Sequence, residues 1–164
     1  MPMIQASLWK KNRIPTDAEL EQIRELLKQL QTNSDEPPPT KEEISGRILS
    51  ATETKNTALL ILRDPDKDNK IIGIGTIHRW CTLVEGYKAW VDDIVVLDGE
   101  YRGQGLGEKI TTTLIAITQD TELAKIRLTS NKQNPERAAA IHLYKKLGFR
   151  ESKTTLWELA ITKD

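Results

Sequence analysis

Apolar residues recur along the chain with two different periods, which predicts a protein that mixes helices and strands. In the segment 17–30 they lie three or four positions apart, as on one face of a helix. Other apolar runs are short or alternate with polar residues, as strands do. The expected helices start at Thr16, Thr40, Leu106 and Asn134 and end near Gln31, Ile48, Ile117 and Leu147. The expected strands cover residues 4–9, 57–64, 70–80, 87–97, 125–130 and 154–161.

Capping residues mark the ends of these helices. Thr16 with Glu19, and Thr40 with Glu43, have the spacing of a capping box, in which each side chain bonds the backbone of the other residue. Gly148 is placed to end the last helix.

The connections between strands predict how they pair. Strands 70–80 and 87–97 are joined by the short stretch "VEGY", which predicts an antiparallel pair. A helix lies between strand 87–97 and strand 125–130, and a right-handed crossover of this kind makes two strands parallel. The fold class is therefore a layered, mixed α/β structure.

The composition is that of an ordinary globular protein. Its 164 residues predict one domain over 1–164. Lysine plus arginine equals aspartate plus glutamate at 24 each, so no net charge favours nucleic acid or a membrane surface. No apolar run is long enough for a membrane span or a signal peptide, so we expect a cytoplasmic protein. Cys81 and two histidines form no metal-binding motif, and no metal is expected.

Three glycines stand where a helix is expected to begin. In "YRGQGLGEKI" they occupy positions 103, 105 and 107, although each costs roughly 1 kcal/mol relative to alanine inside a helix. The start of a helix carries free N–H groups and a partial positive charge, and glycines let an anion approach them closely. Arg102 adds a full positive charge. The pattern predicts a phosphate site.

Two common phosphate motifs do not fit this segment. A dinucleotide fingerprint requires a third glycine at the position that Glu108 occupies. A Walker loop requires serine or threonine after its lysine, but Ile110 follows Lys109. A tight turn with close helix packing is the remaining structural alternative.

Two motifs together resemble the GCN5-related N-acetyltransferase (GNAT) superfamily. Residues 102–107, "RGQGLG", are similar to the pyrophosphate motif of that family, [Q/R]-x-x-G-x-[G/A], and follow a strand that contains "DDIVV". Residues 137–149, "RAAAIHLYKKLGF", are similar to its second coenzyme motif. Either motif is weak alone, whereas the pair at this separation is specific.

The resemblance implies transfer of an acetyl group from acetyl-CoA to a primary amine by direct attack. It also implies a largely antiparallel sheet of six to seven strands with about four helices, in which parallel strands four and five splay apart around the pantetheine arm. Tyr144 matches the tyrosine that often protonates the departing thiolate. The coenzyme-binding residues carried over are Ile94, Val95, Val96, Arg102, Gly103, Gln104, Gly105, Leu106 and Gly107.

A general base must take the proton of the attacking amine, which is mostly protonated at neutral pH. Asp92 and Asp93 are the candidates, as base or as amine-binding carboxylate, or else as a solvated residue and one that holds a loop. Strand alternation would send the two to opposite faces. His78 is an alternative acceptor, although a lone strand histidine is more often structural. The alternative for Tyr144 is a core residue on the apolar stripe of its helix.

Some features depart from the family pattern or leave alternatives. The stretch "LDGE" is one residue longer than usual, and Arg137 stands where the family often has asparagine. Arg137 could bind a coenzyme phosphate or a substrate carboxylate, or only lie on the first helical turn. We expect the acceptor to be a small amine, amino acid or amino sugar, with a peptide amine as a variant, and Trp80 and Trp90 to border its cleft.

A non-catalytic acyl-CoA sensor is the alternative function, because a fold does not by itself imply activity. Dimers are common in the family, so a homodimer is a further partner to test.

Overall fold

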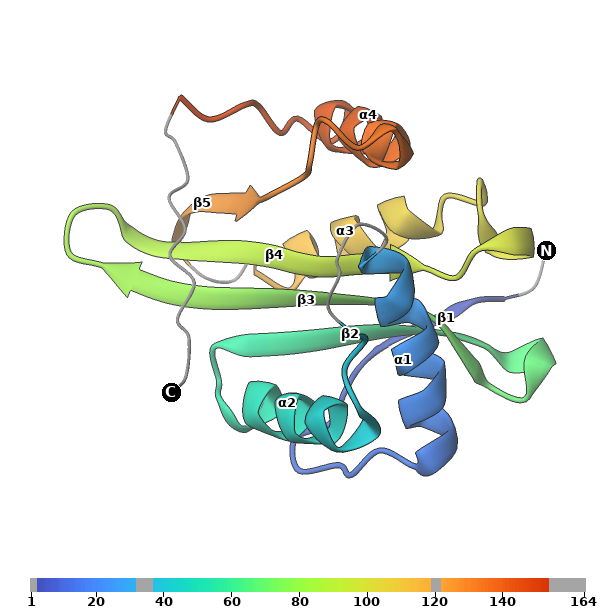
Figure 1. Ribbon diagram of the computed structural model, residues 1–164. Helices are drawn as coiled ribbons and strands as arrows, with labels where there is room; N and C mark the ends of the chain where they lie inside the picture. The colour runs from blue at the N-terminus through green and yellow to red at the C-terminus, as the bar shows by residue number, and fades with distance from the viewer. Residues whose placement is uncertain (1–2, 32–36, 119–121, 154–164) are drawn as a thin grey trace. The chain divides into compact units, whose positions relative to one another are not determined.

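The computed structural model describes residues 3–31, 37–118 and 122–153 and divides into two compact units (Figure 1). The first unit ends at Thr129 and the second begins at Ser130. The elements of the first unit are β1 (Gln5–Leu8), α1 (Asp17–Leu30), α2 (Lys41–Glu53), β2 (Thr57–Asp64), the 3₁₀ turn η1 (Pro65–Lys67), β3 (Lys70–Thr82), β4 (Gly86–Val96), the 3₁₀ turn η2 (Gly99–Tyr101), α3 (Leu106–Ala116) and β5 (Leu123–Leu128). The second unit contains the 3₁₀ turn η3 (Pro135–Arg137) and α4 (Ala138–Lys146).

The strands of the first unit form one sheet in the order β1-β2-β3-β4-β5. All neighbours are antiparallel except β4 and β5, which are parallel. The predicted hairpin and the predicted parallel pair are therefore confirmed, as is the mixed, largely antiparallel α/β fold. Five strands are described rather than six to seven, and the strand expected at 154–161 lies outside the described residues.

Each face of the sheet carries its own hydrophobic core. Leu59 and Ile61 of β2 pack with α1 and α2, whereas Leu60 and Leu62 pack with α3. Successive residues of a strand point to opposite faces, so one fully apolar strand can serve both cores. Figure 1 shows α1 and α2 in front of the sheet and α3 behind it.

The predicted starts of α1 and α2 are confirmed by their caps. Both capping boxes form, at Thr16 with Glu19 and at Thr40 with Glu43. The expected end of α2 at Ile48 is wrong, because the helix continues to Glu53. No proline or glycine interrupts this extension, and the Thr52 hydroxyl donates a hydrogen bond to the Ile48 carbonyl at 2.8 Å.

The helix of the second unit ends close to the expected residue, but its α-helical part begins later than Asn134, after a 3₁₀ turn. The Asn134 side chain accepts a hydrogen bond from the Glu136 amide at 2.9 Å, as a cap residue does. Residues 135–137 form a 3₁₀ turn before α4 begins at Ala138. Gly148 follows with φ +87°, the left-handed conformation that commonly ends a helix. No helix in the described part of the chain is long and apolar enough to cross a membrane.

The packing of α3 against β3 requires glycine at position 75. A Cβ placed on Gly75 would lie 2.5 Å from Cγ2 of Ile110 and 3.0 Å from Cδ1 of Leu114, both on α3. Cβ atoms in proteins are not found as close as 2.5 Å to another side chain, and Ile110 and Leu114 are both fully buried. The helix can therefore pack this closely only over a residue without a side chain.

We expect Gly75→Ala to lower the free energy of unfolding by about 1–3 kcal/mol, because a methyl group would overpack the core at this point. Gly46→Ala is the matched control, since Gly46 is exposed within α2 and a Cβ there meets nothing within 4 Å. That change should stabilise the helix by up to about 1 kcal/mol. Urea denaturation of both variants measures the difference, and equal stability of Gly75→Ala and the unchanged protein would contradict the packing.

Candidate functional site

The parallel strands β4 and β5 pair along only part of β4. The ladder runs from Tyr87, opposite Leu123, to Val91, opposite Leu128. Beyond Val91, β4 continues to Val96 and pairs with β3 on one side, but no described strand pairs with its other side. Residues 92–96 therefore present a free backbone edge where the two parallel strands part.

An extra residue interrupts β4 at the point where this free edge begins. Thr76 of β3 lies opposite Asp92, and Ile74 lies opposite Val95, so the single residue Gly75 faces both Asp93 and Ile94. This is a β-bulge, in which two residues oppose one. Asp93 has φ +52°, a left-handed conformation that aspartate tolerates better than most residues.

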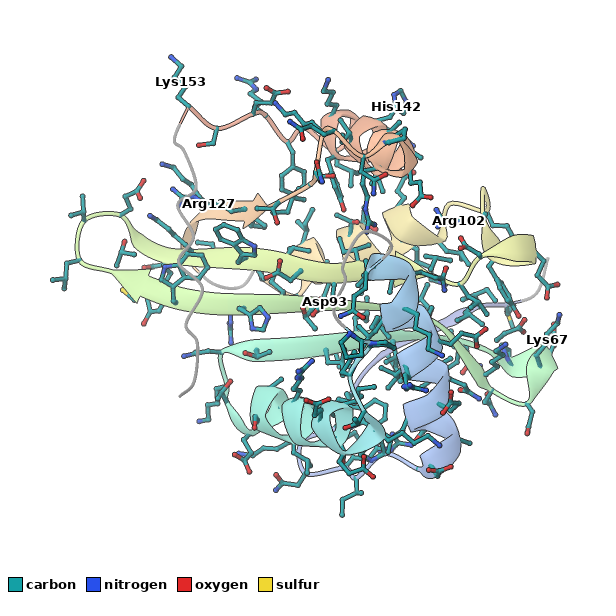
Figure 2. The ribbon with its side chains drawn as sticks, viewed as in Figure 1. Lys67, Asp93, Arg102, Arg127, His142 and Lys153 are labelled. Atoms are coloured by element: carbon teal, nitrogen blue, oxygen red, sulfur yellow. The ribbon has the colours of Figure 1, made fainter. Side chains whose placement is uncertain are left out.

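The bulge brings the two candidate carboxylates to the same face of the sheet. Thr76 pairs with Leu59, which belongs to the core under α1 and α2, so Thr76 and its partner Asp92 point to that face. The Thr76 hydroxyl also donates a hydrogen bond to Asp93 at 3.3 Å. The expectation that Asp92 and Asp93 point to opposite faces is wrong, because the inserted residue breaks the alternation on which it depended. Figure 2 labels Asp93 at this position.

Asp92 lies in a partly buried, polar and aromatic environment. The indole N–H of Trp90 donates a hydrogen bond to its carboxylate at 3.0 Å. Burial raises the pKa of Asp92 and the negative charge of Asp93 raises it further, while the Trp90 hydrogen bond and an electrostatic interaction with His78 lower it. No ion pair among the described residues involves either aspartate.

Histidine and tryptophan side chains extend this face along the same strands. His78 lies opposite Trp90, and its Nδ1 is 3.1 Å from the Thr57 hydroxyl. The rings of Trp80 and Trp90 lie 6.2 Å apart between centroids, tilted by 38°. We call this set the aspartate–tryptophan face. It consists of Thr76, His78, Trp80, Trp90, Asp92 and Asp93.

The glycine turn presents backbone amides in front of α3. Gly103 and Gly105 have φ +77° and +74°, and a Cβ on either would meet nothing within 4 Å. The first hydrogen bond of α3 runs from the Lys109 amide to the Gly105 carbonyl at 3.0 Å, so the amides just before Lys109 precede the helical ladder. The space in front of these amides is open to an anion, as the phosphate hypothesis requires.

Side chains of the turn are themselves held in place. The Arg102 guanidinium pairs with Asp98 through its Nε, and Figure 2 shows Arg102 beside the turn. Gln104 donates a hydrogen bond to the Glu100 carbonyl. Both contacts are local, within four residues, and both shape the turn that precedes α3.

A buried tyrosine anchors this turn, and the sequence patterns did not point to it. Tyr101 is buried, and its hydroxyl donates a hydrogen bond to Asp64 at 2.8 Å, where β2 ends. Burial and the neighbouring Asp64 raise the pKa of Tyr101 to about 12, so the phenol stays a donor. Only the tertiary fold brings positions 64 and 101 together. The nearest sequence signal is the aspartate before Pro65, which predicts a turn.

A cavity of about 580 Å³ lies near this anchor but contains none of the predicted site residues. Its walls come from the last turns of α1, from Lys67 and Lys70, and from residues 97–101. Neither the aspartate–tryptophan face nor the glycine amides of residues 103–107 line this cavity.

Tyr144 and Arg137 belong to the second unit. The ring of Tyr144 meets Phe149 edge to face, with centroids 6.0 Å apart, on α4 and the turn after it. Burial raises the pKa of Tyr144, while the charge of Arg137 opposes this shift. Their assignments as acid and as phosphate ligand stay predictions. His142 is exposed, as expected. The described residues hold no group of three or more histidine, cysteine, aspartate or glutamate side chains that could bind a metal.

Comparison with known proteins identifies the family of this fold. Residues 55–151 match the family described as "Acetyltransferase (GNAT) domain". The chain belongs to the GNAT acetyltransferase family, as the two coenzyme motifs predicted. A search of curated proteins gave no match.

Solved acetyltransferase structures share the fold over almost the whole chain. An acetyltransferase from Trypanosoma brucei is 21% identical, with a TM-score of 0.71, and the match covers 96% of this chain and 99% of that one. Glucosamine-6-phosphate N-acetyltransferase from Arabidopsis thaliana is 19% identical, with a TM-score of 0.69 and coverage of 96% and 98%. An aminoglycoside acetyltransferase from an uncultured soil metagenomic sample, solved with sisomicin, is 15% identical, with a TM-score of 0.72 and coverage of 97% of each chain.

We expect Asp93→Asn to lower the pKa of Asp92, because it removes the neighbouring like charge while asparagine still tolerates the left-handed backbone. Carboxyl ¹³C NMR titration measures the change. Asp68→Asn is the matched control, since Asp68 is exposed and has φ +53° in a distant turn. An Asp92 pKa that responds equally to both variants would show that the two carboxylates are not coupled.

Proposed function

We propose that the protein is an N-acetyltransferase that moves an acetyl group from acetyl-CoA to a primary amine. The observation that carries the proposal is the free edge of β4, which has a phosphate-compatible glycine turn beyond one end and two carboxylates at the other. An extended substrate lying along this edge would have its charged end at the turn and its reactive end near Asp92. Membership of the GNAT acetyltransferase family supports the same function.

The residues of the first unit fit a coenzyme of this shape. The free backbone groups of 94–96 can bond an extended arm as a neighbouring strand would. The amides of 103–107 can bond a diphosphate, and Arg102 adds charge. Acetyl-CoA supplies the activated acetyl thioester. In the second unit, Arg137 is a further candidate ligand for a coenzyme phosphate.

Asp92 is the better placed of the two aspartates to act as general base. Its pKa is raised, so its carboxylate is more basic than an ordinary aspartate, and Trp90 fixes its orientation. In the proposed reaction Asp92 accepts the proton of the acceptor ammonium, directly or through water. Tyr144 donates a proton to the departing sulfur.

The non-catalytic acyl-CoA sensor is the second candidate, and the two functions differ in one measurement. Incubation with acetyl-CoA and a library of amines, with detection of free thiol, should show release that depends on an acceptor. Binding of acetyl-CoA without such release by any amine would favour the sensor.

We expect Gly105→Leu to weaken acetyl-CoA binding by about tenfold or more, because the side chain would occupy the space that the phosphate needs. Gly86→Leu is the matched control: Gly86 has φ +72°, equally open surroundings and a position in the β3–β4 hairpin. Both variants carry the same backbone strain. Isothermal titration calorimetry compares them, and the proposed phosphate site is refuted by equal affinities.

We expect Tyr144→Phe to lower kcat by about 10²-fold or more while acetyl-CoA affinity stays nearly unchanged, because only the proton donor is lost. The ring contact with Phe149 is kept in this variant. Steady-state kinetics and calorimetry together make the comparison. Full turnover by Tyr144→Phe would remove the residue from the acid role.

A further inference from the structure

We propose that the acceptor carries two ammonium groups, one of which is acetylated at Asp92 while the other is bound by Asp93. This inference rests on the proposed function and names the substrate class of the same site. The shared chemistry is that of a diammonium compound whose apolar body lies on the tryptophan rings. Both a linear polyamine and a diamino sugar have this chemistry.

The first support is that two carboxylates occupy one face where a regular strand would provide only one. The bulge opposite Gly75 inserts Asp93 beside Asp92, and Thr76 contacts both positions, by strand pairing and by a hydrogen bond. A single base would be sufficient for proton transfer. The second carboxylate is therefore available for a separate task.

The second support is that the nearby cations of the sheet are already engaged. Glu85, at the β3–β4 turn, forms ion pairs with Lys88, Lys125 and Arg127. Hydrogen bonds from Lys125 and Lys88 lower the pKa of Glu85 to about 2. Figure 2 labels Arg127 on β5, and this arginine lies opposite Trp90 in the ladder yet pairs with Glu85 rather than with Asp92.

The two aspartates place two carboxylates next to each other, with Asp92 half-buried and Asp93 exposed. Burial raises the pKa of Asp92 and the charge of Asp93 raises it further, so the ionised form of Asp92 is disfavoured there. Two ammonium groups would offset this cost with charge-assisted hydrogen bonds. One ammonium group would pair with Asp92 and leave the exposed Asp93 to solvent, and a carboxylate on the acceptor would be repelled.

The third support is the pair of tryptophan rings next to the carboxylates. Trp90 orients Asp92 through its indole N–H, and Trp80 lies 6.2 Å from Trp90 between centroids. Both side chains are only partly buried. Aromatic faces attract cations and the C–H groups attached to them, so a hydrocarbon chain or a sugar ring with amino groups suits this surface.

The test compares acceptors that differ by one ammonium group. With acetyl-CoA as donor, we expect kcat/KM for diaminobutane to exceed that for butylamine by about tenfold or more. The same preference should separate a diamino sugar from glucosamine. A diamino sugar is the acceptor if its preference over glucosamine is the larger of the two and is lost in Trp80→Leu. A polyamine is the acceptor if only diaminobutane is preferred over its monoamine.

The decisive variant is Asp93→Asn, with Asp68→Asn as the control. Because Asp93→Asn also lowers the pKa of Asp92, it can slow the reaction of both acceptors, so the variant should lower kcat/KM for diaminobutane about tenfold more than kcat/KM for butylamine. Asp68→Asn should change neither value. Equal kcat/KM for the members of each pair, or equal effects of Asp93→Asn on both acceptors, would overturn the inference while the acetyltransferase function stands.

A binding measurement keeps the inference testable if no acceptor is acetylated. In the presence of CoA, diaminobutane should shift the carboxyl ¹³C resonances of Asp92 and Asp93, and butylamine should do so only at concentrations about tenfold higher or more. Preferential binding of diaminobutane without turnover would refute the proposed catalysis but support the diammonium site. Equal binding of diaminobutane and butylamine would refute the site.

Discussion

The close contact between α3 and β3 at Gly75 is the constraint on which the rest of this structure depends. Because Ile110 and Leu114 fill the space that a side chain would need, β3 has only backbone at this position. Opposite it, β4 carries Asp93 and Ile94 in place of one residue. The bulge, the end of the β4–β5 ladder and the two carboxylates thus occur within a few residues of one another. Packing on one face of the sheet is thereby linked to chemistry on the other.

Electrostatics divides β4 into two halves with different roles. Near the hairpin, Glu85 forms ion pairs with the buried Lys88 and with the more exposed Lys125 and Arg127, so positive and negative charges lie together there. Near the bulge, Asp92 and Asp93 form no ion pair with a lysine or arginine among the described residues. A protein with no net charge therefore has a local negative region on this half of the strand, in keeping with a cationic acceptor.

The glycine turn depends on contacts made before the glycines themselves. The stretch "LDGE" leads into η2, and the buried hydrogen bond from Tyr101 to Asp64 ties the turn to the end of β2. The Lys67–Glu100 ion pair joins the same two segments at the surface. A hydrogen bond to a buried carboxylate contributes more than a neutral one, so Tyr101 is the stronger anchor. The amides that follow are held ready for a ligand at little further cost in entropy.

The sequence by itself determined the order of elements, the capped helix starts, the parallel pair and the family. Each follows from short-range periodicity, from capping pairs such as Thr16 with Glu19, or from motifs such as residues 102–107. Only the tertiary structure decided that Asp92 and Asp93 share a face and that Tyr101 bonds Asp64. Alternation along one strand is local, but a bulge arises from register with a second strand. A helix packed on Gly75 and a contact across 37 positions are likewise properties of the folded chain, which no spacing in the sequence encodes.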